Sequence, residues 1–336
     1  MKIDLFQTLA VFDELADEWD ALLPPGNSLN FFMRSTWQRI WWNCLGVGDL
    51  FVLAVRDDDG PLAGIAPLYV VPEPGGRASL GVVGGVDVTD YVDLITAPGR
   101  ERDVLGAVLS YLCSSQTPDW SSLHVRNVPE SSSTRQILPE LAAQNGLRAT
   151  ISVEDVCPVV DLPDSYEAYL EALPKKERHE LRRKRRRAEA NDVGYYTVGQ
   201  EHDIHEEVEA FLTLMALYTP EKAEFLKQPG HREFFKAIGP AMLEQGLLDL
   251  SFLTVEGKRA AAMWSYAYGD RMMLYNSGLD PAGFSALSPG IVLLSYNIEH
   301  TIARGFKKYD FLQGDEEYKY RMGGQNTSVY NVIIER

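Results

Sequence analysis

The sequence Ser288-Pro289-Gly290 stands before an apolar stretch and has the residue types that begin a helix. Serine suits the N-cap, and proline suits the first helical position because its missing N–H would have no partner there. A helix N-terminus presents unpaired N–H groups and partial positive charge, and glycine lets a ligand come close. The segment therefore has the chemistry to hold a diphosphate. The plain start of a core helix explains the same residues, so both interpretations stay open.

Two aspartates are further candidates for chemistry. Asp310 lies in an expected strand, where its carboxylate could act as a base or orient an amine. An aspartate at a strand end also commonly caps a turn or pairs with an arginine. Asp93 follows a glycine-rich stretch that is no phosphate loop, because no Gly-Lys-Ser/Thr follows it. Asp93 could bind an amine, and turn chemistry accounts for its neighbour Asp90.

One basic island stands in an acidic chain. The segment Lys175–Arg187 holds nine Lys or Arg and two Glu, whereas the whole chain has a net charge of -16. Leu181 is almost its only large apolar residue, so this helix cannot be a core helix. Arg178, Arg182 and Arg183 could contact a polyanion. Alternatively, the helix is solvated and pairs with the acidic remainder of the chain.

The composition excludes several classes of protein. With 45% hydrophobic and 24% charged residues the chain is expected to be globular. Three widely spaced cysteines without a CxxC pair, and histidines without HExxH, predict no metal. The sequence contains no GxSxG elbow, so it gives no indication of a serine hydrolase. The apolar stretches are too short for membrane insertion and the N-terminus lacks a signal-peptide pattern, so we expect a cytoplasmic protein. The net negative charge disfavours DNA binding.

The second half of the chain must position these residues with strands and one long helix. Strands with turn residues between them are followed by a helix that begins at Ser288 and stops at Gly305. Further strands follow that helix. This order predicts an α+β fold with a mostly antiparallel sheet and one crossover helix. The expected strands cover residues 250–255, 260–268, 271–279, 307–314 and 329–335.

The first half repeats this layout. Helical segments around Phe12–Leu22 and Ser35–Cys44 precede a hairpin of residues 51–56 and 62–71. In the second half, helices near Glu206–Leu217 and Arg232–Glu244 precede a hairpin in the same way. We therefore predict two similar halves, residues 1–160 and 161–336, with the basic helix 175–190 in the second. The C-terminal strands are expected to be able to pack back on the first half.

Three phrases of the sequence carry a family resemblance. They are the Tyr-rich segment before LPKKERHELRRKRRRAE, the phrase LYNSGLDPAGFSALSPGIVLLSYNIEHTIARG, and YDFLQGDEEYKYRMG. Together they resemble the CelD-like branch of the GNAT acetyltransferases, which is related to the FemABX aminoacyltransferases. The resemblance covers nearly the whole chain and is most specific over 274–321. It implies a tandem GNAT-like fold, with two mixed, mostly antiparallel sheets flanked by helices.

The resemblance also implies roles for particular residues. Tyr318 best matches the tyrosine that protonates the departing thiolate, with Tyr320 as the reserve, and Lys319 could hold a phosphate. Ser277, with Tyr275 and Asn276, ends the strand where a thioester carbonyl would lie. Asp93 is expected to face a groove between the halves and to receive the acceptor amine, with Asp310 as a second candidate base.

The implied function is acyl transfer from acetyl-CoA or another acyl-CoA to an amine or hydroxyl. The acceptor would be a small molecule, a glycan or a peptide. The Arg/Gln-x-x-Gly-x-Gly/Ala signature of ordinary GNAT enzymes is absent, and Ser-Pro-Gly occupies its place. Two alternatives therefore stay open: a FemABX-like transferase that uses aminoacyl-tRNA, and a GNAT-like protein that binds without turnover. Whether the donor is acyl-CoA or aminoacyl-tRNA, Arg178 and Arg182 would contact its phosphates.

Overall fold

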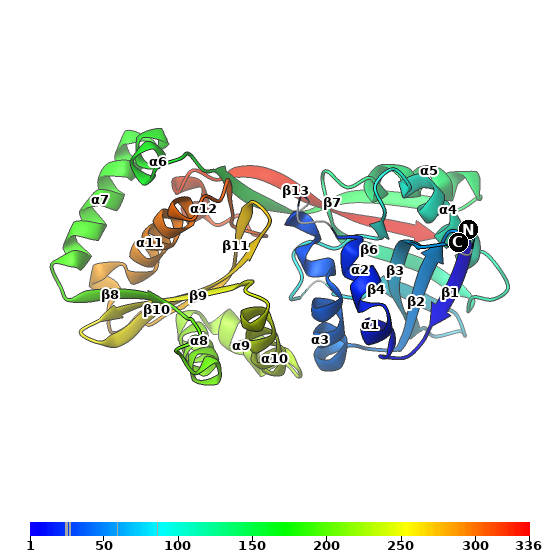
Figure 1. The fold of residues 1–336 in the computed structure, drawn as a ribbon, viewed down its shortest axis with the longest axis horizontal. Helices are drawn as coiled ribbons and strands as arrows, with labels where there is room; N and C mark the ends of the chain where they lie inside the picture. The colour runs from blue at the N-terminus through cyan, green and yellow to red at the C-terminus, as the bar shows by residue number, and fades with distance from the viewer. Residues whose placement is uncertain (24–25, 27, 59, 86) are drawn as a thin grey trace. The chain divides into compact units, whose positions relative to one another are not determined.

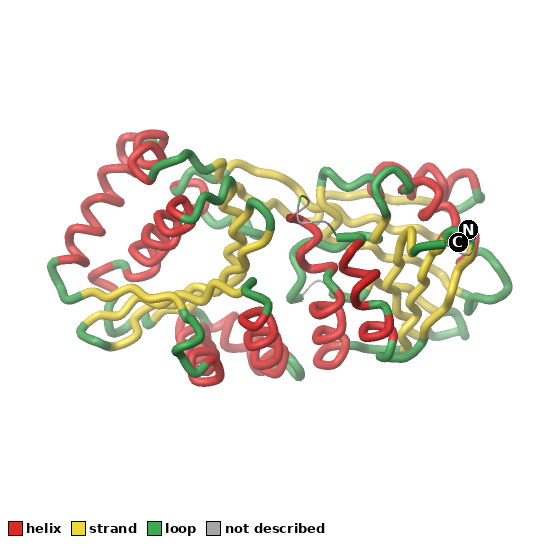
Figure 2. Tube along the Cα trace, in the orientation of Figure 1, coloured by secondary structure: helices red, strands yellow, loops and turns green. Residues whose placement is uncertain are grey.

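The computed structural model describes residues 1–23, 26, 28–58, 60–85 and 87–336, and the chain divides into two compact units (Figures 1 and 2). Unit 1 comprises Met1–Val156 and Thr327–Arg336, and unit 2 comprises Cys157–Asn326. Each unit has mixed, mostly antiparallel strands flanked by helices, so the predicted α+β class is confirmed.

Unit 1 has the strand order β1-β2-β3-β4-β6-β13-β7, and β5 pairs with β3. The pairs from β1 to β4 are antiparallel, β4 and β6 are parallel, and β6 and β13 are antiparallel. Its strands are β1 (Lys2–Phe6), β2 (Asp49–Arg56), β3 (Leu62–Pro72), β4 (Ala78–Val82), β5 (Ile95–Thr96), β6 (Trp120–Pro129), β7 (Arg148–Asp161) and β13 (Gln325–Glu335). Its helices are α1 (Val11–Glu14), α2 (Ala16–Ala21), η1 (Ser28–Met33), α3 (Ser35–Leu45), α4 (Glu101–Leu112) and α5 (Thr134–Gln144).

Unit 2 takes the C-terminal part of β7 as its first strand and has the order β7-β12-β11-β10-β9-β8. All its pairs are antiparallel except β11 with β12. Its other strands are β8 (Val193–Thr197), β9 (Leu248–Val255), β10 (Lys258–Tyr268), β11 (Arg271–Leu279) and β12 (Lys308–Asp310). Its helices are α6 (Tyr166–Ala172), α7 (Lys175–Glu189), α8 (Ile204–Tyr218), α9 (Pro220–Lys227), α10 (His231–Glu244), η2 (Ser285–Leu287), α11 (Pro289–Ala303) and α12 (Glu317–Arg321).

The two units share one layout. In each, helices precede a hairpin, a third strand follows, and a crossover containing a helix leads to a strand parallel to the third. The crossover helix is α4 in unit 1 and α11 in unit 2. In unit 2, α8 and α10 cover one face of the strands and α11 covers the other (Figure 1). The repeated layout that the sequence predicts is therefore present.

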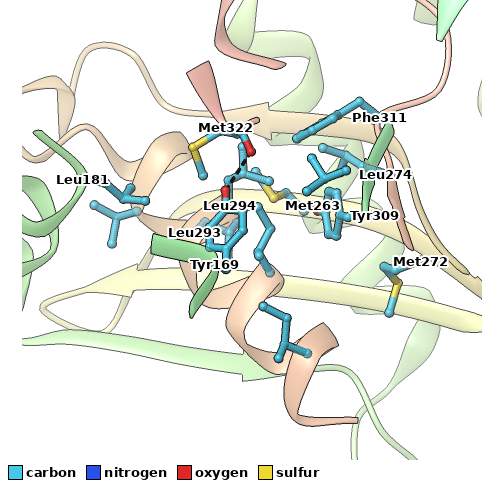
Figure 3. Packing of buried hydrophobic residues seen from close by; sticks show 14 of the residues in the cluster. Tyr169, Leu181, Met263, Met272, Leu274, Leu293, Leu294, Tyr309, Phe311 and Met322 are labelled. Carbon is cyan, nitrogen blue, oxygen red and sulfur yellow. Dashed lines mark hydrogen bonds between the residues drawn. The ribbon is translucent and has the colours of Figure 1, made fainter. Parts of the chain in front are cut away.

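The core of unit 2 lies where α6, α7 and α11 meet the strands (Figure 3). Leu293 and Leu294 of α11 pack there with Met263 of β10. The hydroxyl of Tyr169 donates to the carbonyl of Met322 at 2.9 Å, so this buried phenol is satisfied. Full burial of each such side chain contributes about 1.5–3 kcal/mol, and this core fixes α11 against β11.

The basic helix α7 is less free than its composition suggests. Leu181 and Ala188 are buried against the core. Arg185 lies over the rings of Tyr166 and Tyr296, with its guanidinium carbon 5.1 and 4.3 Å from their centroids. It also pairs with Glu299 of α11 at 2.8 Å. One arginine therefore acts as a packing residue, because its planar cation can stack on aromatic faces.

The predicted length of the strand over 307–314 is wrong, since β12 covers only Lys308–Asp310. Leu312 has a φ of +54°, which is incompatible with a continuing strand. The carboxylate of Asp310 accepts the N–H of Leu312 at 2.8 Å and so turns the chain here. No helix among the described residues is long and apolar enough to cross a bilayer.

Candidate active site

Unit 2 contains a cavity of about 790 Å³ where two parallel strands separate. β11 pairs with β12 only through Arg271–Met273 and Lys308–Asp310. β11 then continues to Leu279, whereas β12 ends. The unpaired end of β11 and the loop after β12 form two walls of the cavity, and the starts of α9 and α11 also line it.

A β-bulge helps to separate the two strands. Trp264 of β10 pairs with Asn276 of β11, and Ser265 pairs with Leu274, so Tyr275 is the extra residue of the register. A bulge bends its strand and increases the local twist. The residues after it, including Asn276 and the predicted site residue Ser277, line the cavity.

The N-terminus of α11 meets this cavity, with Ser288, Pro289 and Gly290 in its wall. The N–H groups of Ile291 and Val292 both donate to the carbonyl of Ser288, at 3.1 Å each. Pro289 has no N–H, and no described residue accepts the N–H of Gly290. The first turn therefore keeps one amide hydrogen and the positive end of the helix dipole for a ligand.

Tyr318 lies in the wall formed by the chain after β12. Its ring packs edge-on against Phe311, with centroids 6.0 Å apart. Burial raises the pKa of Tyr318 well above its ordinary value, and the nearby Glu316 and Tyr218 raise it further. No described residue accepts a hydrogen bond from its hydroxyl. The phenol therefore keeps its proton at neutral pH and can donate it into the cavity.

Lys319 is buried and holds the loop that forms this wall. Its Nζ donates to the carbonyls of Leu312, Gln313 and Gly314, at 3.3, 2.6 and 3.1 Å. It also pairs with Glu316 at 2.9 Å. The left-handed backbone of Leu312 costs roughly 1–2 kcal/mol, so the loop needs such contacts. Because four oxygens surround this ammonium, its role as a phosphate ligand stays a prediction.

Asp310 does not line the cavity. Its carboxylate is fully buried and pairs with Nη1 of Arg271 at 2.5 Å. It also accepts the N–H of Leu312, and so holds the same loop as Lys319 from the other side. These contacts describe a positioning residue, and a catalytic role for Asp310 stays a prediction.

The structure does not bring three other predicted residues to this cavity. Asp93 lies in unit 1, in the wall of a second cavity of about 350 Å³, where burial raises the pKa of its carboxyl. Arg178 donates to the carbonyl of Glu171 at 3.2 Å, and Arg182 pairs with Glu167. The cavity of unit 2 therefore gathers the predicted residues Ser277, Ser288, Gly290, Tyr318 and Lys319.

Sequence reasoning missed Lys222, which lies in the cavity wall on α9. Its Nζ donates to Oδ1 of Asn276 at 2.7 Å and to the carbonyl of Ser277 at 2.6 Å. Burial lowers the pKa of Lys222 to about 8, with Glu316 opposing the shift and Lys319 adding to it. The signal for α9 is Thr219-Pro220, an N-cap followed by proline at the first helical position.

Comparison with known proteins finds a family match over part of the chain. Residues 175–320 match the family model described as an acetyltransferase (GNAT) domain. The match includes α9, α11 and Tyr318, and thus most of the cavity wall. No curated protein sequence matches the chain.

Solved structures share the fold at low sequence identity. FemX is similar with a TM-score of 0.67 and 12% identity, over 99% of this chain and 97% of its own. The C-terminal domain of a putative lysylphosphatidylglycerol synthetase from Agrobacterium fabrum has a TM-score of 0.59 and 12% identity, over 96% and 92%. A conserved protein of unknown function from Bacteroides thetaiotaomicron VPI-5482 has a TM-score of 0.60 and 12% identity, over 100% of both chains.

These findings confirm the predicted GNAT-superfamily, FemABX-related fold. They do not test the CelD-like branch, which stays a prediction. Residues 175–320 therefore match a GNAT acetyltransferase domain, and the chain has a GNAT-superfamily fold that FemX shares.

Proposed function

We propose that unit 2 binds an acyl-CoA thioester in its cavity and transfers the acyl group directly to an amine or hydroxyl. A volume of about 790 Å³ is in the range of small-molecule sites. The observation that carries the proposal is that one cavity offers both the free N–H of Gly290 and the hydroxyl of Tyr318. The first can bind an anionic phosphate, and the second can donate a proton to a leaving thiolate.

In this proposal the diphosphate of the donor accepts the N–H of Gly290. The thioester then lies along the end of β11, where the strand no longer pairs with β12. Backbone N–H groups there would polarise the carbonyl oxygen as negative charge develops on it. The acceptor attacks the carbonyl carbon, the C–S bond breaks, and the thiolate takes the proton of Tyr318.

The remaining site residues act by positioning. Lys319 and Asp310 hold the loop before Tyr318 from two sides. A shift of about 1 Å in a reacting group can lower the rate about a hundredfold, so this loop must be rigid. Ser277 and Ser288 stand at the two ends of the donor's path, on β11 and before α11. The acceptor is a small molecule, a glycan or a peptide.

The test compares Tyr318→Phe with Tyr320→Phe on the same short helix, where the hydroxyl of Tyr320 is hydrogen-bonded to Asp315 and Asn326. Calorimetric titration with coenzyme A and thiol release from acetyl-CoA with a panel of amines and sugars measure binding and turnover. Tyr318→Phe should bind coenzyme A normally and lose roughly 10²–10⁴-fold in turnover, whereas Tyr320→Phe should match the wild type. Unchanged turnover in Tyr318→Phe would remove the residue from the mechanism.

Binding measurements with charged tRNA and coenzyme A distinguish the aminoacyl-tRNA alternative. Exposed arginines of α7, including Arg183 and Arg187, would support it as contacts to RNA phosphates. That alternative requires charged tRNA to bind with an affinity that falls steeply with salt, and coenzyme A not to bind. Binding of acyl-CoA without transfer to any acceptor would instead indicate a GNAT-like binding protein.

A further inference from the structure

The amine of Lys222 differs from the other lysine of the cavity in the oxygens that surround it. Lys319 has three carbonyls and the carboxylate of Glu316 around its Nζ. Lys222 has two short acceptors, Oδ1 of Asn276 and the carbonyl of Ser277. No carboxylate among the described residues forms an ion pair with it. A neutral amine keeps two N–H groups, so it can still donate both of these hydrogen bonds.

The two short hydrogen bonds fix the orientation of this nitrogen. A tetrahedral amine has three positions besides its carbon, and Asn276 and Ser277 occupy two of them. The third has only a contact of 3.5 Å to Oγ of Ser277, which is long for a hydrogen bond. Since Lys222 and both partners line the cavity, a ligand there can reach the third position. When that proton leaves, a lone pair takes its place and both short bonds remain.

Burial and the neighbouring Lys319 favour loss of that proton, whereas Glu316 and the ring of Tyr218 favour the ammonium. Tyr218 at the end of α8 places its ring 5.0 Å from Nζ. Glu316 and Lys319 act on it from the loop and from α12, and the carboxylate of Glu316 is paired with Lys319. Glu221 and Tyr318 are the other titratable neighbours in this part of the cavity wall. Burial disfavours the charged form and lowers the pKa of Lys222 to about 8.

Lys222 and Tyr318 contact different walls of the cavity. Lys222 bonds to the end of β11, and Tyr318 packs on Phe311 after β12. A thioester between the separating strands would therefore have a proton acceptor on one wall and a proton donor on the other. Glu221 is exposed on the surface, and Glu316 is engaged by Lys319.

We propose that Lys222 is the general base that takes the proton from the acceptor during acyl transfer. The assignment rests on the proposed function of the cavity. As the acceptor nitrogen or oxygen bonds to the acyl carbon, its proton passes to Nζ of neutral Lys222. The C–S bond breaks and the thiolate takes the proton of Tyr318. Solvent then carries the proton of the Lys222 ammonium to the Tyr318 phenolate, which restores both residues.

The test uses Lys222→Met, which keeps the apolar stem, and Lys222→Arg, which keeps charge and hydrogen-bond donors. Lys227→Met on the same helix is the control, since Lys227 is exposed and pairs with Glu224. Thiol release from acetyl-CoA with ethanolamine as the probe nucleophile is measured from pH 6 to 10. We expect both Lys222 variants to lose roughly 10²–10⁴-fold at saturating donor and to lose the rise of the wild-type rate near pH 8. Lys227→Met should keep both.

Two further measurements separate this role from others. Calorimetry with coenzyme A should give the same affinity for Lys222→Met as for the wild type. Amine labelling of the wild type with acetic anhydride, followed by mass spectrometry of peptides, should show Lys222 titrating below Lys227. Full activity in Lys222→Arg, equal thiol release by wild type and Lys222→Met, or equal titration of the two lysines would overturn the assignment. Failure of the proposed function is distinct, since the wild type would then bind no coenzyme A.

Discussion

The buried ion pair of Asp310 and Arg271 leads to a prediction about stability that can be tested without a substrate. Asp310 is fully buried, and the side chain of Arg271 is only 12% exposed. Removing one partner of such a pair leaves a buried charge and costs about 3–5 kcal/mol of unfolding free energy. Asp310→Ala also takes the acceptor from the buried N–H of Leu312, which costs about a further 1–3 kcal/mol.

A double-mutant cycle in urea unfolding measures this coupling. Asp310→Ala and Arg271→Met should each destabilise unit 2 by about 3 kcal/mol or more. The double variant should recover part of the loss, with a coupling energy of about 2 kcal/mol. Asp161→Ala is the control, because its partner Lys308 lies on β12 as Asp310 does, but the side chain of Asp161 is 84% exposed. It should cost less than about 1 kcal/mol.

Additive losses would show that the carboxylate is not coupled to Arg271, and an Asp310→Ala variant as stable as the wild type would show that it does not hold the loop. If such a stable variant also lost turnover, Asp310 would be a catalytic residue, as the strand-end position allows.

Three further predictions concern backbone space, donor binding and pH. Gly278→Ala should destabilise the protein by about 1–3 kcal/mol, because the added Cβ would lie 2.4 Å from the backbone nitrogen of Met215. Gly106→Ala is the control and should stabilise slightly, since its helix position is open. Thermal unfolding measures both. In Gly290→Ala the added Cβ would meet only the end of the Leu279 side chain, 3.1 Å away, so the variant should fold normally. The same Cβ should keep the diphosphate from coming close, so calorimetry should show weaker binding of coenzyme A. Equal affinity would contradict the phosphate contact. Burial raises the pKa of Asp93, so its contribution to stability is complete below the unfolded pKa of about 3.9 and is lost as the pH rises through the folded pKa. The stability of Asp93→Asn relative to wild type should therefore increase with pH in urea unfolding, and a constant difference would count against it.

Local turn chemistry made much of unit 2 predictable from the sequence. Ser288-Pro289 marks the start of α11, and Gly305, with a φ of +82°, follows its end. The hairpins and third strand lie where the apolar, β-branched runs predict them. These elements are determined by contacts between near neighbours in the chain, which sequence patterns report directly.

What the sequence did not reveal depends on contacts between distant residues. Asp310 carries the same local pattern whether it is a base or a partner of Arg271, and only the pairing of β11 with β12 decides its surroundings. Lys222 is one of many lysines until α9 places it beside Asn276, 54 residues away. The role of Arg185 between two tyrosine rings is likewise invisible in a run of basic residues.

A crystal structure of the protein with coenzyme A tests the central claim most directly. We predict that a diphosphate oxygen lies about 3 Å from the amide nitrogen of Gly290 and that the sulfur lies beside the hydroxyl of Tyr318. Coenzyme A bound elsewhere on the protein, with the start of α11 in contact with no phosphate, would contradict this account.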